Sequence, residues 1–144
     1  MKLKLLSLLM LSLVFTAGMS QNTVIISFDG SIKANYSITT GETNLLVPLK
    51  KSDCKKLKKL LVQIKSDLIG AGPYKRSLDI TDKADQTVVN LPETANGAFT
   101  LTDAATKALL AKGSLLKLYL LMQPADERLL IPTKHIYMGT LSAK

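Results

Sequence analysis

The stretch TVIISFDGSIKANYSIT, residues 23–39, decides the fold class. Val24, Ile26 and Phe28 recur at every second position, Asp-Gly follows at 29–30, and a second alternation runs through 32–38. A period of two on both sides of an Asp-Gly pair predicts two antiparallel strands joined by a tight hairpin. Polar residues fill the other positions of the second strand, so we expect one face on a core and the other in water.

Short candidate strands separated by turns continue along the chain. They cover residues 45–49, 59–66, 77–80, 87–91, 98–101, 116–122, 129–131 and 135–141. Pro48 places the first of these at an edge or an end of a sheet, because proline donates no backbone hydrogen bond. The strand at 116–122 is apolar on both faces, which predicts a central position.

Two short helices interrupt this pattern. Residues 50–65 satisfy both a helical and an extended period, and we interpret them as a helix at 53–58, capped by Ser52 or Asp53, before the strand. Asp103 predicts the cap of a second helix, with Gly113 as its stop. We therefore expect an all-β protein, an antiparallel β-sandwich of immunoglobulin-like or jelly-roll-like type with one or two short helices. A closed β-barrel is the alternative.

The first twenty residues predict export. Lys2 and Lys4 precede a run of 13 mostly apolar residues at 5–17, and small residues follow. This is the pattern of a secretory signal peptide, and the run is shorter than the ~20 residues that span a bilayer. We place cleavage between Ser20 and Gln21, with Ala17 or Gly18 as nearby alternatives. Residues 1–20 are then the signal peptide, and residues 21–144 form a single domain in the periplasm or outside the cell.

The charge of the chain limits the classes of partner that we expect. Without Lys2 and Lys4 the formal charge falls from +8 to +6, so the exported chain is basic. Such a charge attracts anionic lipids, acidic glycans and nucleic acids alike. Arginine is the residue favoured for bidentate phosphate and base recognition, yet the exported part contains only Arg76 and Arg128. We therefore expect no nucleic-acid partner.

The sequence predicts no cofactor and no metal. Cys54 is the only cysteine, so it forms no internal disulfide, and we interpret it as a buried, inert thiol. Asp79, Asp82 and Asp85 recur at every third position, whereas a calcium loop places its acids at alternate positions with a glycine. These aspartates are interpreted as turn residues.

Catalysis is not expected either. His135 is the only histidine, and no Gly-x-Ser-x-Gly elbow accompanies it. The acids that could form a glycosidase pair lie beside turns, namely Asp29, Glu42, Glu93 and Glu127. A hydrolase with a pocket around His135 is the third hypothesis. Tyr74, in a loop rich in glycine, is a possible ligand contact for a soluble glycan.

A lysine-rich segment is the strongest candidate site. It contains Lys50, Lys51, Lys55, Lys56, Lys58 and Lys59. A solvated basic face is the structural interpretation of this segment, and a binding patch for anionic glycan or lipid is the functional one. The first hypothesis for the whole protein is a non-enzymatic structural or protein-interaction component of the cell envelope or surface. Anionic glycan or lipid binding through the lysines is the alternative.

Overall fold

The computed structural model describes residues 21–70 and 72–144, so the predicted signal peptide lies outside the described residues. Strands make up 55% of the structure and helices 11%, which confirms the all-β class with two short helices. The strands are β1 (Gln21–Phe28), β2 (Ser31–Thr39), β3 (Leu46–Leu49), β4 (Leu60–Lys65), β5 (Tyr74–Thr81), β6 (Thr87–Ala95), β7 (Ala98–Leu101), β8 (Leu115–Pro124) and β9 (Lys134–Ala143). The helices are α2 (Lys51–Lys56) and α3 (Ala104–Ala111).

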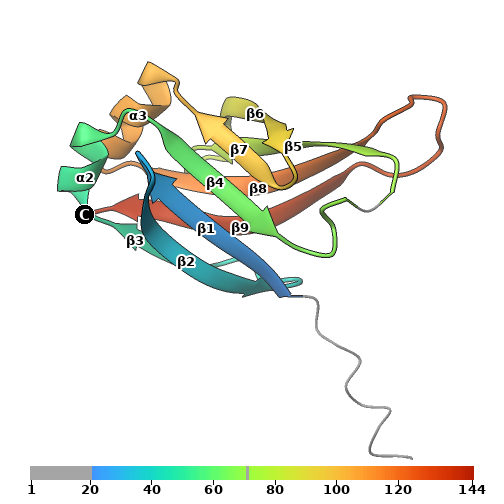
Figure 1. Ribbon diagram of the computed structural model, residues 1–144, viewed down its shortest axis with the longest axis horizontal. Coiled ribbons are helices and arrows are strands. Elements are labelled where there is room, and N and C mark those ends of the chain that lie inside the picture. The colour runs from blue at the N-terminus through green and yellow to red at the C-terminus, as the bar shows by residue number, and fades with distance from the viewer. Residues whose placement is uncertain (1–20, 71) are drawn as a thin grey trace, which may run out of the picture.

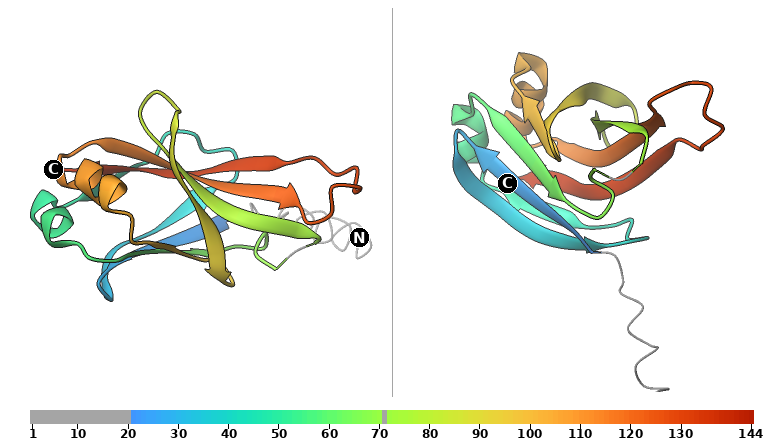
Figure 2. Two further views of the ribbon diagram at one scale, coloured as in Figure 1. Left: turned by 90° about the horizontal axis from the view of Figure 1, so that it is seen from above. Right: turned by 45° about the vertical axis from the view of Figure 1, so that its right-hand side comes forward.

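The nine strands form one mixed sheet that is nearly barrel-shaped (Figures 1 and 2). Their order is β2-β1-β4-β7-β6-β5-β8-β9-β3. The barrel, which was the alternative to the sandwich, thus fits this sheet. All neighbours are antiparallel except β3, which pairs in parallel with β9. After β2 the chain crosses to the opposite end of the strand order, so β2 and β3 are the two edges and a seam separates them.

The hairpin of β1 and β2 confirms the interpretation of residues 23–39. Asp29 and Gly30 adopt positive φ angles of 49° and 86°, as the tight turn requires. The register pairs Ile26 with Ala34 but Ser27 with Ile32, so Lys33 forms a bulge in β2. The bulge breaks the expected alternation. Ile32 is opposite Ser27 instead of on the core face and is 63% exposed.

The core fills the inside of the barrel, mostly with apolar residues from alternate strand positions, although β2 buries only Ile38 and β6 only Leu91. In β8, which lies between β5 and β9, the inward residues Leu116, Leu118, Leu120 and Met122 are at most 1% exposed. The outward residues of β8 are only partly covered, and Leu115 is 41% exposed. The expectation of burial on both faces of this strand was therefore wrong, because its outer face has no covering layer among the described elements.

The two helices lie together at one end of the barrel (Figure 1). Asp103 caps α3 as predicted, accepting the Thr106 backbone N–H at 2.8 Å, and Gly113 follows its end at a φ of 82°. The start of α2 was predicted wrongly: it begins at Lys51, and neither Ser52 nor Asp53 caps it. The Lys51 N–H instead donates to the Lys144 carbonyl at 2.7 Å, so a tertiary contact sets its start.

Residues 129–131 are not a strand, contrary to expectation. They lie in the loop between β8 and β9, where the Leu129 N–H closes a turn onto the Asp126 carbonyl at 3.0 Å. Neither of the two described helices has the length and apolarity needed to cross a bilayer.

Candidate functional site

The six lysines predicted as a binding patch lie on and around α2. Lys50 precedes the helix, Lys58 and Lys59 follow it, and all six side chains are exposed. The lysines are exposed because the segment is amphipathic. Cys54 and Leu57 are its positions that turn into the core, at 2% and 7% exposure. Every lysine between and around these two residues is thereby left in solvent.

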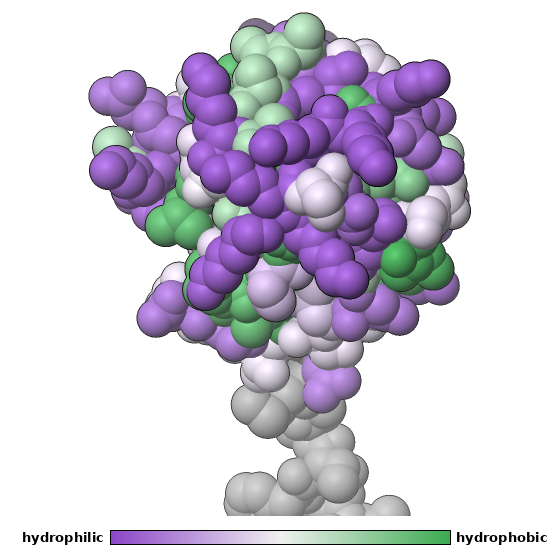
Figure 3. Space-filling model, turned by 90° about the vertical axis from the view of Figure 1, so that its left-hand side faces the viewer, coloured by the Kyte–Doolittle hydropathy of each residue, from purple (hydrophilic) through white to green (hydrophobic). Residues whose placement is uncertain are grey.

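Tertiary packing adds lysines from α3 to this group. Lys107 Nζ donates to the Lys58 carbonyl at 2.9 Å. Lys112, the exposed C-cap residue of α3, precedes Gly113, and a Cβ at Gly113 would lie 3.6 Å from Lys51 Nζ. We call this group the basic end, and it consists of Lys50, Lys51, Lys55, Lys56, Lys58, Lys59, Lys107 and Lys112. Hydrophilic side chains dominate this end of the molecule in Figure 3.

The carboxylates among the basic end are already engaged. Asp29 accepts the backbone N–H groups of Lys59 at 2.8 Å and Lys58 at 3.2 Å, and these bonds hold the pKa of Asp29 below its usual value. Asp53 pairs with Lys33 at 3.1 Å. Asp103 is the cap of α3. Each of these acids serves the backbone or a neighbouring strand, and none of the lysines of the basic end takes part in an ion pair among the described residues.

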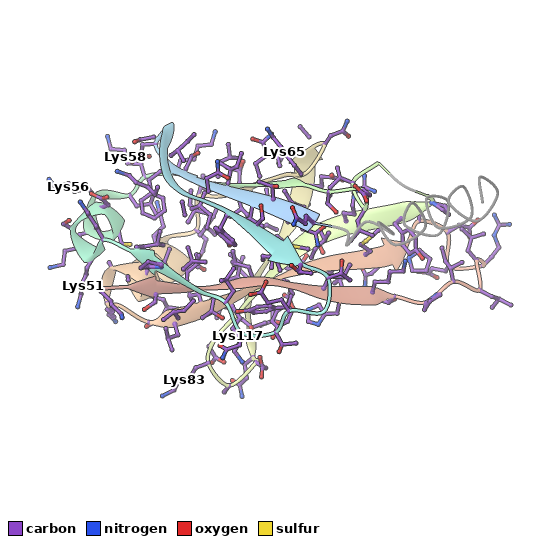
Figure 4. The ribbon with its side chains drawn as sticks, turned by 90° about the horizontal axis from the view of Figure 1, so that it is seen from below. Lys51, Lys56, Lys58, Lys65, Lys83 and Lys117 are labelled. Atoms are coloured by element: carbon purple, nitrogen blue, oxygen red, sulfur yellow. The ribbon has the colours of Figure 1, made fainter. Side chains whose placement is uncertain are left out.

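Lys33 and Lys144 also lie next to α2, through the Lys33–Asp53 ion pair and the bond from the Lys51 N–H to the Lys144 carbonyl, whereas further lysines lie away from it. Figure 4 shows Lys51, Lys56 and Lys58 at one end of the molecule, with Lys65, Lys83 and Lys117 apart from them. Lys117 is engaged by Asp85, whose carboxylate lies 2.6 Å from its Nζ. The positive charge is thus concentrated at one end and is not a property of the whole surface.

Tyr74 is far from the basic end, because β5 begins with it and pairs with the terminus of β8 at Pro124. Its ring is partly buried against the core, and Lys134 Nζ lies over it, 5.5 Å from the ring centre. The structure therefore does not bring Tyr74 together with the lysines. A role as a glycan contact stays a prediction.

A second cluster lies on the outer face of β5, β8 and β9. The His135 ring stacks on Tyr119 with 4.4 Å between ring centres, and its Nε2 lies 3.5 Å from a carboxylate oxygen of Asp79. Asp79 is 9% exposed and also accepts a hydrogen bond from Thr87 Oγ1 at 3.2 Å. Sequence reasoning missed this cluster. The outward phase of β8 places Tyr119 on this face, but only the strand pairing brings Asp79 and His135 to it.

A hollow of about 370 Å³ adjoins this cluster. It is lined by Asn22, Thr39, Thr40, Gly41, Glu42, Thr43, Tyr119, His135, Ile136 and Tyr137. Tyr137 is structural, because its hydroxyl accepts the Leu45 N–H at 3.0 Å and donates to the Leu45 carbonyl, thereby holding the loop before β3. The lining residues include no serine or cysteine, so a Ser–His or Cys–His pair is not assembled here.

The three aspartates predicted as turn residues do not converge on one point. Asp79 lies in the outer cluster, Asp82 accepts the N–H groups of Ala84 and Gln86, and Asp85 accepts from Lys117 and, at the edge of the outer cluster, from the Tyr119 hydroxyl at 3.3 Å. Within residues 21–70 and 72–144, no three His, Cys, Asp or Glu side chains are placed to hold a metal ion. Cys54 is buried as predicted.

No protein-family model, curated protein or solved structure matches this chain.

Proposed function

We propose that this chain is an exported, non-enzymatic protein of the cell envelope or surface whose basic end binds closely spaced anionic groups. The observation that carries the proposal is the gathering of six exposed lysines around α2, with Lys107 of α3 and Lys112 at its C-cap added to them. Each lysine close to an anionic surface contributes about 1 kcal/mol, and the contributions require that several ammonium groups reach the same surface.

The presence of lysine and not arginine at the basic end indicates which kind of anionic ligand it binds. Lysine presents a flexible point charge, whereas arginine presents a planar fork that matches one phosphate or carboxylate. The basic end contains lysine alone. This favours anionic groups repeated along a glycan or packed on a lipid surface over a single small ligand held bidentately.

The test measures binding of the purified exported protein to three probes at low and high salt. These are vesicles of phosphatidylglycerol with phosphatidylcholine, vesicles of phosphatidylcholine alone, and heparin as a sulfated glycan. The test variant replaces Lys55, Lys56, Lys58 and Lys59 with glutamine. We expect salt-sensitive binding to an anionic probe that falls about 100-fold or more in this variant, since four cations are removed.

A matched control removes four exposed lysines from other parts of the barrel, namely Lys65, Lys75, Lys83 and Lys134. Its net charge equals that of the test variant. If the basic end is the site, only the test variant loses affinity; if the overall positive charge of the protein is responsible, both variants lose affinity equally. Equal losses in both variants, or no binding to either anionic probe, would rule out the basic end as a site. The vesicle and heparin results separate a lipid from a glycan.

A protein partner is the second candidate function. The open seam between β2 and β3 favours it, because unpaired strand edges and exposed apolar side chains are the features through which sheets recruit other chains.

A further inference from the structure

The hollow beside His135 differs in charge from the rest of this basic protein. It measures about 370 Å³, within the range of ~300–1,000 Å³ that is typical of small-molecule sites. Within the described part of the chain, its lining contains no lysine or arginine, and Glu42 is its one carboxylate. Glu42 is partly buried and takes part in no ion pair among the described residues. The hollow therefore offers no cation to an anionic ligand and opposes it with a carboxylate.

The loop that forms one wall of the hollow is fixed by hydrogen bonds. The Glu42 N–H donates to the Thr39 carbonyl at 3.0 Å, and a Glu42 carboxylate oxygen accepts the Thr39 N–H at 3.4 Å. Beyond this turn, the Tyr137 hydroxyl bonds both the N–H and the carbonyl of Leu45. Glu42 and Thr43 are thus held between two anchors, so a ligand meets them without the cost of ordering a loop.

The polar groups of the lining match hydroxyl groups. Asn22 is 1% exposed and its carboxamide oxygen accepts from Ser66 Oγ, which leaves its NH₂ group as the part of the amide that can donate. Thr39 and Thr43 have hydroxyls that both donate and accept, whereas Glu42 only accepts. An ammonium group is a donor alone and would give the Asn22 donors no acceptor. A ligand with several hydroxyls satisfies both kinds of group.

Apolar surface in the same lining suits the C–H face of a sugar ring. Ile136 and the rings of Tyr119 and Tyr137 line the hollow together with His135. The Tyr119 hydroxyl donates to Asp85 at 3.3 Å and the Tyr137 hydroxyl bonds the loop before β3, so both residues present ring surface. His135 stacks on Tyr119, and its side chain is 47% exposed. The lining thus combines ring surface with groups that bind hydroxyls, as a sugar requires.

The hollow lies far from the basic end. β9 passes the hollow at residues 135–137 and ends at Ala143, next to the Lys144 carbonyl that accepts the Lys51 N–H of α2. At ~3.3 Å per residue, the strand separates the two sites by roughly 25 Å. Figure 1 shows the helices at one end of β9 and the β8–β9 loop at the other. A small ligand in the hollow does not reach the lysines.

We propose that the hollow beside His135 binds one ring of a neutral sugar. The ring packs its C–H face on the aromatic side of the lining, and its hydroxyls bond Glu42, Asn22 and the threonines. A sugar that carries a carboxylate is disfavoured by Glu42. The hollow and the basic end share no residue and prefer ligands of different charge, so either proposal can fail without the other.

The test titrates the purified exported protein, labelled with nitrogen-15, and follows its amide signals by NMR. The neutral probes are glucose, galactose, mannose and N-acetylglucosamine, and the uronic acids of the first three are the charged probes. We expect at least one neutral sugar to bind with a Kd of about 1–10 mM and to shift signals of residues 39–43 and 135–137. Its uronic acid should bind about tenfold more weakly.

Variants locate the bound sugar. Glu42→Gln removes the charge but keeps an acceptor for the Thr39 N–H, and it should reduce the preference for the neutral sugar over its uronic acid to about twofold or less. The matched control Glu127→Gln removes an exposed acid of the loop before β9 and should keep the tenfold preference. His135→Ala should weaken binding of the neutral sugar about fivefold.

Three results would overturn the proposal. They are no shift with any of the four neutral sugars, shifts that lie outside the hollow, and a preference that Glu42→Gln leaves unchanged. Choline is the fourth comparison. If it binds more tightly than every sugar, the hollow is a site for organic cations and the proposal is wrong.

Discussion

The hydroxyl of Tyr36 occupies the space that a side chain at Gly139 would need. A Cβ at Gly139 would lie 2.9 Å from Tyr36 Oη and within 3.4 Å of the ring carbons, and the φ of Gly139 is 133°. Tyr36 belongs to β2 and Gly139 to β9. Because Gly139 has no side chain, the Tyr36 ring can reach across the seam and contact β9. Burial raises the pKa of Tyr36 well above its usual value, which keeps the hydroxyl a donor to Met138.

Gly139→Ala should destabilise the fold by about 1–3 kcal/mol, because it adds overpacking and a strained φ. The measurement is the free energy of unfolding in denaturant. Tyr36→Ala opens the space, so the cost of Gly139→Ala should shrink in a double-mutant cycle with it. Equal costs in the two backgrounds would show that backbone strain alone is responsible.

Glu93→Ala should destabilise the fold strongly. Arg76 Nε lies 3.1–3.2 Å from both carboxylate oxygens of Glu93, and the two side chains are only 10% and 16% exposed. Glu93 also accepts the Gly97 N–H at 2.7 Å, which holds the turn between β6 and β7. Removing one partner of a buried pair costs on the order of 3 kcal/mol in the free energy of unfolding.

The control for this pair is the double variant Arg76→Met with Glu93→Gln. The glutamine keeps an acceptor for Gly97, and the methionine removes the charge that would be left unpaired. Its stability should lie closer to the natural chain than that of Glu93→Ala. A double variant that is less stable than the single one would contradict this account.

Acid should weaken the attachment of the β1–β2 turn to the segment before β4. Hydrogen bonds from Lys59 and Lys58 lower the pKa of Asp29 in the folded chain, so its contribution is present above the unfolded pKa and is lost as pH falls through the folded pKa. Asp29→Asn should flatten the dependence of unfolding free energy on pH in that acidic range. An unchanged slope would mean that Asp29 contributes nothing to acid sensitivity.

Cys54 should be unreactive in the native chain. Burial raises the pKa of its thiol above the ordinary value, and the residue is 2% exposed. Iodoacetamide should modify it slowly in buffer and rapidly in denaturant, with mass spectrometry as the measurement. Fast labelling of the folded chain, or a disulfide-linked dimer on a gel without reductant, would contradict a buried thiol.

Local patterns determined much of the β-rich architecture. The period of two around Asp29 and Gly30 specifies its hairpin because both residues tolerate positive φ, and Asp103 specifies the start of α3 because its carboxylate reaches the backbone N–H of Thr106. The lysines around α2 were also identified from the sequence, since a charged side chain stays in solvent wherever its neighbours Cys54 and Leu57 are buried.

Only the tertiary structure decided what these elements do together. Whether the sheet curls into a near-barrel depends on which strands pair, and β3 joins β9 in parallel across a separation of more than ninety residues that no local period encodes. The β5–β8 and β8–β9 pairings assemble the cluster of Asp79, Tyr119 and His135, the packing of α3 against α2 adds Lys107 to the basic end, and β2 and β3 are left as the two edges of the sheet. The alternation of apolar and polar residues along a strand determines which of its faces is buried. Which other strand it pairs with depends on the free energy of contacts between residues that are far apart in the sequence.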